Sequence, residues 1–316
     1  VPKGNLPAAL GPFVGRDGPG AQLVERLGQE RLVTLTGPGG TGKTRLSQHI
    51  ARRVASTYPD GVWLVELAAL PPGGDAALAT AAVLDVRESS GQSMEAAVVD
   101  HLRRCTLLLV LDNCEHQRES FPAIASLLEA APELKILATS RERMNLRGEQ
   151  VIELAGLPVP ADSAQPPAEL LRHEAIQLFV QIAQAADPAF ALTAENAPDV
   201  LRICQLVDGV PLGIELAAAW MRVLSCREIA DEVAESLDFL MSTNADRPAR
   251  QQSLRAVFNY SWELLNPAER QALRQLAIFP GRFTREAAAA VVALGEPAAS
   301  TLPARRASLE LLTLLS

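Results

Sequence analysis

The stretch GPGGTGKT, residues 37–44, constrains the fold of this chain more than any other feature of its sequence. It follows a short apolar run, RLVTLT (31–36), and precedes a segment in which Leu46, Ile50 and Val54 fall on one helical face. The sequence therefore predicts a strand, a tight glycine-rich turn and the start of a helix. Because a helix N-terminus carries unpaired N–H groups and a partial positive charge, we expect it to bind an anionic phosphate.

Two classes of ligand fit this loop. Gly37, Gly39 and Gly42 match the dinucleotide pattern G-x-G-x-x-G, which also requires an acidic residue roughly 20 positions later to bind the ribose hydroxyls. Glu66, at the end of the apolar run GVWLVE, could supply that acid. Residues 37–44 equally match G-x-x-x-x-G-K-T, the loop that holds the phosphates of a nucleoside triphosphate. The loop alone leaves both interpretations open.

A second motif favours the triphosphate. Lys43 is long enough to reach the β and γ phosphates and the Thr44 hydroxyl can bind Mg²⁺, whereas a dinucleotide site needs neither group. The run TLLLVLD (106–112) ends on Asp112, which fits the acid that holds Mg²⁺ at the carboxyl end of a strand. We therefore expect Mg²⁺ to be bound by Thr44 and Asp112. The residues expected to bind the phosphates are Gly37, Gly39, Gly40, Thr41, Gly42, Lys43, Thr44 and Arg45.

A third candidate site follows the run LKILATS (134–140). Thr139, Ser140 and Arg141 would project toward the γ phosphate, where the Arg141 guanidinium could distinguish ATP from ADP. We expect Arg141 to act as this sensor.

The pattern of the chain up to residue 155 predicts an α/β fold. Near-continuous apolar strands alternate with helical segments, which indicates a doubly wound parallel sheet with helices on both faces. The expected strands are 31–36, 61–67, 106–112, 134–140 and 150–154. A Pro-rich stretch, 156–170, marks a boundary, and helical patterns follow it. Capping signals predict helix starts at Ser225 and Asn266.

Composition narrows the class of protein. The net charge of −8 argues against a protein that coats nucleic acid, and one of the three lysines is Lys43. The four cysteines lack metal-ligand spacing, which favours a reducing, cytoplasmic location. No apolar stretch approaches the ~20 residues of a membrane span, so we expect no membrane contact.

The chain lacks an initiator Met and ends abruptly at LELLTLLS, so we expect a piece of a longer protein.

Three further stretches complete a set of five ordered motifs: FVGRDGPGAQLVERL (13–27), CQLVDGVPLGIELAAAW (204–220) and LRAVFNYSWELLNPAERQALRQLAIFPGRFT (254–284). The set resembles the STAND ATPases, the signal-transduction P-loop ATPases of the NB-ARC and related types, and in particular the module found in bacterial multidomain regulators. The resemblance implies an N-terminal linker with the hydrophobic-hydrophobic-Gly-Arg motif (1–30), a P-loop domain (31–157), a helical ARC1-like domain (158–245) and a truncated winged-helix domain (246–316).

The resemblance also implies a function, an ADP- or ATP-dependent switch with bound Mg²⁺. Val14 and Arg16 would lie against the adenine and ribose, and Pro211 would pack on the base. Many relatives carry two consecutive acids at the end of the Mg²⁺-binding strand, but here the second position is Asn113. Because an amide cannot accept a proton from water, we expect slow or no hydrolysis unless Glu115 acts as the base.

The resemblance also implies binding partners, and the sequence leaves alternative functions open. The expected partners are sensor repeats and an effector on the same polypeptide and, on activation, further copies of the chain. Between Arg247 and Glu286, seven arginines against three glutamates give an excess of four positive charges, which could contact DNA. The resemblance favours an internal latch instead. The alternative functions are an AAA+-type turnover ATPase and a DNA-binding regulator with a structural nucleotide.

Overall fold

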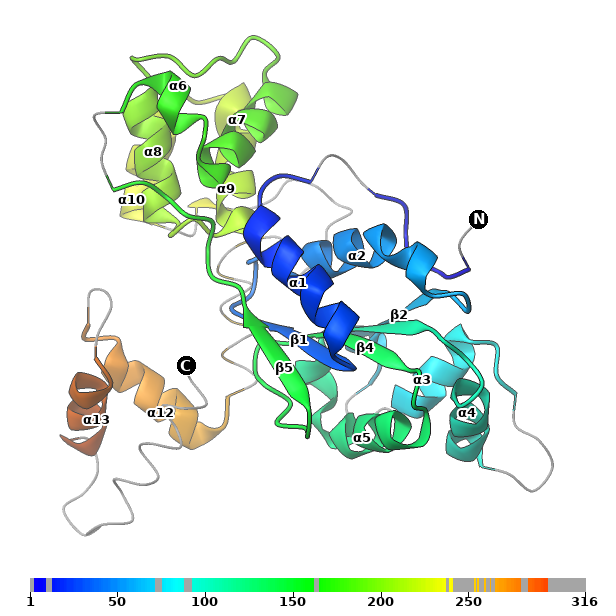
Figure 1. Cartoon of the computed structure of the whole chain (residues 1–316). Helices are drawn as coiled ribbons and strands as arrows, with labels where there is room; N and C mark the ends of the chain where they lie inside the picture. The colour runs from blue at the N-terminus through cyan, green and yellow to red at the C-terminus, as the bar shows by residue number, and fades with distance from the viewer. Residues whose placement is uncertain are drawn as a thin grey trace. The chain divides into compact units, whose positions relative to one another are not determined.

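A computed structural model shows the chain as two compact units, Val1–Leu254 and Arg255–Ser316, which we describe separately (Figure 1). The described residues are 3–9, 13–71, 76–87, 93–161, 165–236, 239–240, 253, 255, 259, 262, 265–279 and 284–294.

The first unit contains one sheet of five strands in the order β2-β3-β4-β1-β5. The strands are β1 (Leu32–Thr36), β2 (Val62–Glu66), β3 (Leu108–Asp112), β4 (Lys135–Thr139) and β5 (Glu149–Glu153). All four pairings are parallel, and β1 lies between β4 and β5. The parallel sheet predicted from the sequence is confirmed, and every strand ends within two residues of its expected bounds.

Helices cover both faces of this sheet (Figure 1). One face packs against α1 (Asp17–Gln29) and α2 (Lys43–Arg53), and the other against α3 (Ala76–Val83), α4 (Met94–Leu102) and α5 (Phe121–Ala130). Side chains alternate along each strand: Leu108 and Val110 join the cluster with α1 and α2, whereas Leu109 and Leu111 join the opposite cluster. Burial on both faces explains why these strands read as continuous apolar runs.

Helix α1 lies inside the segment 1–30, which we expected to be a linker. Leu23 and Leu27, one helical turn apart, are fully buried in the same cluster as Val33 and Leu35 of β1. This spacing is the amphipathic signal of a helix that packs on a sheet. Helix α1 is therefore part of the α/β core rather than a connection to it.

Residues 3–5 lie along the edge strand β2. The Val62 N–H donates to the Lys3 carbonyl at 3.1 Å, and Gly4 forms a parallel bridge with Val62. The side-chain amide of Asn5 continues the pairing, because it donates to the Leu64 carbonyl at 2.9 Å and accepts from the Leu64 N–H at 2.6 Å. These bonds satisfy edge groups that would otherwise be open to another strand.

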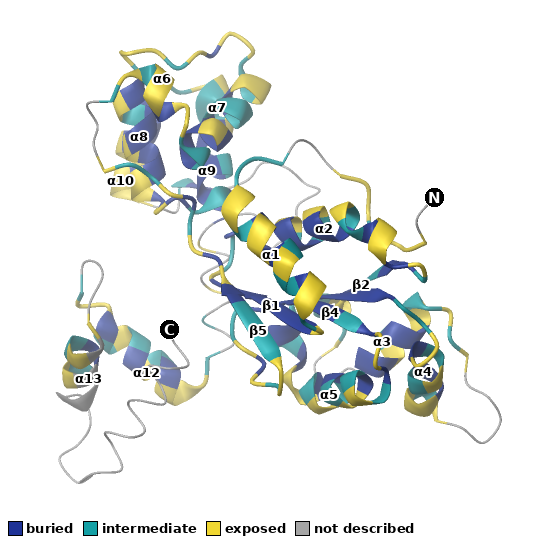
Figure 2. Cartoon of the chain, viewed as in Figure 1, coloured by how far each residue is buried: buried dark blue, intermediate teal, exposed yellow. Residues whose placement is uncertain are grey.

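Short helices follow the sheet in the first unit, and Figure 2 shows their buried inner faces. They are α6 (Pro167–Leu170), α7 (Glu174–Ala186), α8 (Ala197–Leu206), α9 (Pro211–Ala218) and α10 (Cys226–Glu235). The capping box predicted at Ser225 is confirmed, since Ser225 and Glu228 exchange both bonds. The boundaries at 157/158 and 245/246 stay predictions. None of the described helices has the length and apolarity that a membrane span requires.

The second unit contains α12 (Pro267–Leu276) and α13 (Arg285–Leu294), which share a small cluster of Ala272, Leu276 and Ala288. The helix start predicted at Asn266 is confirmed by a capping box with Glu269. The winged-helix domain at 246–316 stays a prediction. Much of that range lies outside the described residues, including three arginines of the basic cluster, Arg247, Arg250 and Arg282.

Candidate functional site

The glycine-rich loop joins the carboxyl end of β1 to the first turn of α2. A Cβ atom on Gly37 would lie 2.2 Å from the Leu154 carbonyl oxygen, so only glycine allows this close approach to the segment after β5. Gly42 precedes α2 with a φ of 89°, a left-handed conformation that glycine adopts without strain. The two glycines thereby turn the chain so that the N-terminal N–H groups of α2 face the loop.

The Lys43 side chain folds back over the loop. Its ammonium donates to the carbonyl oxygens of Gly37 at 2.6 Å and Pro38 at 2.9 Å, and the residue is only 8% exposed. Both bonds are made to backbone atoms, so the loop itself fixes where the positive charge lies. The ammonium is therefore placed among groups that the sequence predicted to surround phosphates.

Four charged groups from different elements influence one another at this point. Burial lowers the pKa of Lys43 to about 8, while the charge of Glu115 raises it, that of Arg141 lowers it and that of Asp112 raises it. These residues come from α2, from the end of β3, from the 3₁₀ segment η3 (Cys114–Ser120) that follows it, and from the loop after β4. The fold thus gathers the predicted catalytic residues at the carboxyl end of the sheet.

Asp112 lies between two hydroxyl groups. One of its oxygens, Oδ1, accepts from Thr44 Oγ1 at 2.7 Å and from Thr139 Oγ1 at 2.6 Å, and Asp112 is only 4% exposed. The Thr139 hydroxyl also accepts from the Asn113 N–H at 3.0 Å, which fixes its orientation. A carboxylate and a hydroxyl are the oxygen ligands that Mg²⁺ prefers beside a phosphate. Thr44 and Asp112 therefore fit the metal that the sequence predicted.

The strand order excludes the dinucleotide interpretation as we framed it. A dinucleotide-binding sheet places its second strand next to its first, so that the acid ending the second strand reaches the ribose. Here β3 and β4 separate β2 from β1, which puts Glu66 on a strand roughly 14 Å away at ~4.8 Å per strand. Glu66 therefore cannot take the ribose-binding role.

Thr139, the last residue of β4, and Ser140, the next one, are placed differently from our expectation. Thr139 and Ser140 are fully buried, and the Thr139 hydroxyl bonds to Asp112. Nε of Arg141 lies 3.2 Å from Oε1 of Glu115. Contact of Arg141 with a γ phosphate stays a prediction, while the Thr139 hydroxyl supports the carboxylate of Asp112.

Arg16 supports the backbone of the glycine-rich loop, residues 37–44, which we call the phosphate loop. Its guanidinium donates to the carbonyl oxygens of Thr41 at 3.0 Å and Ala155 at 2.6 Å, and the residue is 8% exposed. Burial lowers the pKa of Arg16, and the neighbouring charge of Glu174 opposes that shift. Val14, two residues earlier, is half-buried. Contacts of Val14 and Arg16 with an adenine and a ribose stay predictions.

Helix α9 begins at Pro211 against the phosphate loop. The Leu212 N–H donates to the Gly40 carbonyl at 3.2 Å, and Arg45 Nη1 lies 3.1 Å from Glu215 Oε1. Sequence reasoning missed Glu215, because no local pattern links it to a residue 170 positions earlier. The packing of Pro211 on a base stays a prediction.

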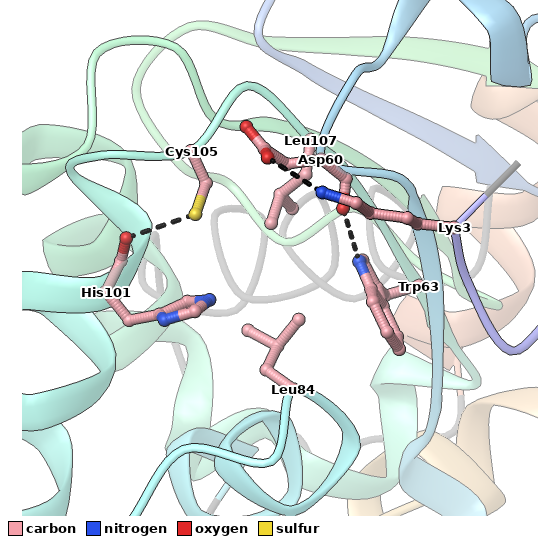
Figure 3. Close-up of a pocket in the computed structure, with 7 residues that line it drawn as sticks. All are labelled: Lys3, Asp60, Trp63, Leu84, His101, Cys105 and Leu107. Atoms are coloured by element: carbon pink, nitrogen blue, oxygen red, sulfur yellow. Dashed lines mark hydrogen bonds and ion pairs between the residues drawn. The ribbon is translucent and has the colours of Figure 1, made fainter.

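A separate cavity of about 170 Å³ lies at the opposite, amino end of β2 and β3 (Figure 3). The Trp63 ring N–H donates to the Asp60 carbonyl at 2.9 Å, and the Cys105 thiol donates to the His101 carbonyl at 3.3 Å. Lys3 pairs with the Asp60 carboxylate at 3.6 Å. This cavity contains none of the residues predicted to bind nucleotide.

Comparison with a solved structure supports the P-loop fold. The Walker-type ATPase PABY2304 of Pyrococcus abyssi superposes with a TM-score of 0.58 over 95% of this chain and 89% of that chain, at 13% identity. At this identity the likeness shows the fold alone. The parallel five-stranded sheet with helices on both faces is that of a P-loop NTPase. No protein-family model matches the chain.

Sequence comparison identifies mycobacterial relatives. The "Putative HTH-type transcriptional regulator Rv0890c" of Mycobacterium tuberculosis is 39% identical over 272 residues, which cover 84% of this chain. The chain spans only 29% of that regulator's length. The "Uncharacterized protein Rv0894" of the same organism is 37% identical over 287 residues, which cover 90% of this chain and 70% of Rv0894. With a P-loop NTPase fold and this level of identity over most of both proteins, the chain belongs to the same protein family as Rv0894.

Proposed function

We propose that this chain is an adenine-nucleotide-dependent switch, the ATP-binding core of a larger transcriptional or signalling regulator. One observation carries the proposal: a single carboxylate oxygen of Asp112 accepts from both Thr44 and Thr139, next to the buried ammonium of Lys43. A core that served packing alone would gain nothing from a charged network of this kind, because buried charges cost free energy unless they are paired. A triphosphate with its metal requires these groups.

Each residue has a distinct role in the proposed site. The N–H groups of the loop and of the first turn of α2 bind the phosphate oxygens, and Lys43 neutralises their charge. Thr44 and Asp112 hold Mg²⁺, which would reduce the negative charge on the phosphates. Arg141 contacts the γ phosphate and so makes the site respond to ATP differently from ADP. Val14, Arg16 and Pro211 are proposed to enclose the ribose and the base.

The response to nucleotide passes through the contacts between the phosphate loop and α9. The Leu212 N–H bonds to the Gly40 carbonyl, and Arg45, the residue after Thr44, pairs with Glu215. A change in loop conformation therefore alters the support of α9. Moving a switch from 1:99 to 99:1 requires ~5.5 kcal/mol of discrimination between the two states, which a few charge-assisted contacts to one phosphate can supply.

The relatives support the regulatory part of the proposal. The name of Rv0890c describes an HTH-type transcriptional regulator, and the chain matches 29% of its length. By analogy, the remaining parts of a longer polypeptide would carry the effector and the sensor repeats. We also propose that residues 158–245 act as a helical ARC1-like domain and residues 246–316 as a winged helix that serves as an internal latch.

Limited proteolysis of the full chain tests the switch. We expect ADP and a slowly hydrolysed Mg·ATP analogue to give different cleavage patterns, and Lys43→Ala to give the nucleotide-free pattern with both. Identical patterns with ADP, with the analogue and without nucleotide would contradict the proposal. Rapid ATP turnover that rises with protein concentration would instead favour an AAA+-type motor.

A further inference from the structure

Glu115, which is buried, and Arg141, which is half-buried, form an ion pair whose charges both act on Lys43. Nε of Arg141 lies 3.2 Å from Oε1 of Glu115, and the two side chains are 17% and 1% exposed. The side-chain amide of Asn113 donates to the same oxygen at 3.4 Å. The second oxygen of Glu115, Oε2, is buried and has no hydrogen-bond partner among the described residues. One oxygen is thus anchored by two donors while the other is available to accept a proton.

A buried acceptor without a partner is a costly feature of a fold. It destabilises the native state, and more strongly when the group is charged. Most buried polar atoms are therefore paired, and an exception calls for a ligand, a water molecule or a catalytic role. Water is the smallest donor that would satisfy Oε2 of Glu115.

The chain turns sharply at the end of β3, two residues before Glu115. Asn113 has a φ of 63°, a left-handed conformation that asparagine tolerates better than most residues, and the chain turns there into the 3₁₀ segment η3. The charge of Glu115 reaches Lys43 and raises its pKa. A second ion pair, Arg118 with Glu142, joins η3 to the loop after β4. The loop supplies the arginine of one ion pair and η3 supplies the arginine of the other, so two ion pairs hold these segments together.

We infer that Glu115 is the general base for slow ATP hydrolysis and that Asn113 and Arg141 are the positioning residues that hold it. This inference rests on the proposed function. Oε2 accepts a proton from water while the water oxygen bonds to the γ phosphorus. The bond from the γ phosphorus to the bridging oxygen breaks, and its electron pair stays on ADP. The products are ADP, phosphate and a proton that Glu115 returns to solvent.

Single-turnover hydrolysis of Mg·ATP by the full chain, measured beside ADP affinity, tests this inference. We expect Glu115→Gln to slow hydrolysis at least ~100-fold, because general bases contribute about 10²–10⁴-fold. Glu119→Gln is the matched control, since Glu119 is an exposed carboxylate on the same 3₁₀ segment and its substitution should not change the rate. ADP affinity should change far less than the hydrolysis rate in both variants, because Glu115 acts in the chemical step and influences ADP binding only through the charge of Lys43.

Variants of Asn113 test whether Glu115 acts as the base in place of a second acid directly after Asp112. Asn113→Ala should slow hydrolysis about tenfold at unchanged ADP affinity, because Oε1 of Glu115 loses one of its two donors. Asn113→Asp should not accelerate hydrolysis, since a second carboxylate beside Oε1 repels Glu115. Arg141→Lys should restore part of the rate lost in Arg141→Ala, because a lysine can still donate to Oε1.

Three results would overturn the inference: parental hydrolysis in Glu115→Gln, faster hydrolysis in Asn113→Asp, and a parent that hydrolyses no faster than Lys43→Ala. All three are compatible with ADP binding by the parent chain, so they would contradict the base assignment without contradicting the proposed function. A parent chain that does not bind ADP would contradict both the base assignment and the proposed function. If Glu115→Gln fails to bind ADP, the Asn113 variants decide the question.

Discussion

Thr139 offers a sharp test of the support that we assign to Asp112. Thr139→Val keeps the shape of the side chain but removes a hydroxyl that donates to Asp112 at 2.6 Å and accepts from the Asn113 N–H at 3.0 Å. A hydrogen bond to a charged group contributes ~1.5–3 kcal/mol, and a backbone N–H left without a partner costs about 1 kcal/mol at this half-buried position. We therefore expect a loss of about 2–4 kcal/mol in the free energy of unfolding.

Thr34→Val is the matched control. Thr34 lies on β1 of the same sheet, is fully buried like Thr139, and its hydroxyl has no hydrogen-bond partner within the described part of the chain. Replacing an unpaired buried hydroxyl by a methyl group should be neutral or stabilising by about 1 kcal/mol. The same substitution is thus expected to have opposite effects on two neighbouring positions.

Urea denaturation followed by tryptophan fluorescence measures this difference. At a slope of about 2 kcal/mol per M, a loss of ~3 kcal/mol lowers the midpoint for Thr139→Val by about 1.5 M, while the midpoint for Thr34→Val stays at or above that of the parent. Equal midpoints for the two variants would refute the hydrogen-bonding scheme around Asp112.

Three further predictions concern the loop and the metal site. Asp112→Ala should lower the affinity for Mg·ATP at least tenfold more than the affinity for metal-free ADP. Calorimetry that shows equal losses of affinity for the two ligands would contradict the role of Asp112 in binding Mg²⁺. The pKa of Lys43 is about 8 and only the ammonium binds phosphate, so the dissociation constant for metal-free ADP should rise toward tenfold per pH unit above pH 8. It should be nearly flat between about pH 7 and pH 8, above the second pKa of ~6 of the ADP phosphate itself. A flat profile to pH 9.5 would count against the role of Lys43. Gly37→Ala should destabilise the chain by at least ~2 kcal/mol, because its Cβ atom would meet the Leu154 carbonyl, whereas Gly18→Ala, with open space around it, should not; similar melting curves would argue otherwise.

Local patterns in the sequence predict the sheet and the loop well. The apolar runs ending at Asp112 and at Thr139 are strands, and the residues of G-x-x-x-x-G-K-T turn from β1 into α2. These features depend on neighbouring residues: alternation along a strand, glycine at a positive φ, and a helix that begins at Lys43. The contact between Thr44 and Asp112 also followed, because carboxyl ends of parallel strands lie at one edge of a sheet.

Contacts between distant segments were not predictable in the same way. The sequence indicated Thr139 as a residue facing phosphate, but the insertion of β4 between β1 and β3 brings its hydroxyl to Asp112. The pairing of Arg45 with Glu215 depends on how α9 packs against the loop, which no periodicity encodes. Helix α1 is an exception. The spacing of its buried leucines is a local pattern in the sequence and indicates a helix that packs on the sheet, although we expected this segment to be a linker.

The measurement closest to the central claim is a calorimetric titration of the full chain with ADP and, separately, with NAD. The account predicts saturable 1:1 binding of ADP, loss of that binding in Lys43→Ala, and no heat from NAD. Binding of ADP with equal affinity to the parent and to Lys43→Ala, or binding of NAD in place of ADP, would contradict the assignment of residues 37–44 as a nucleotide phosphate loop.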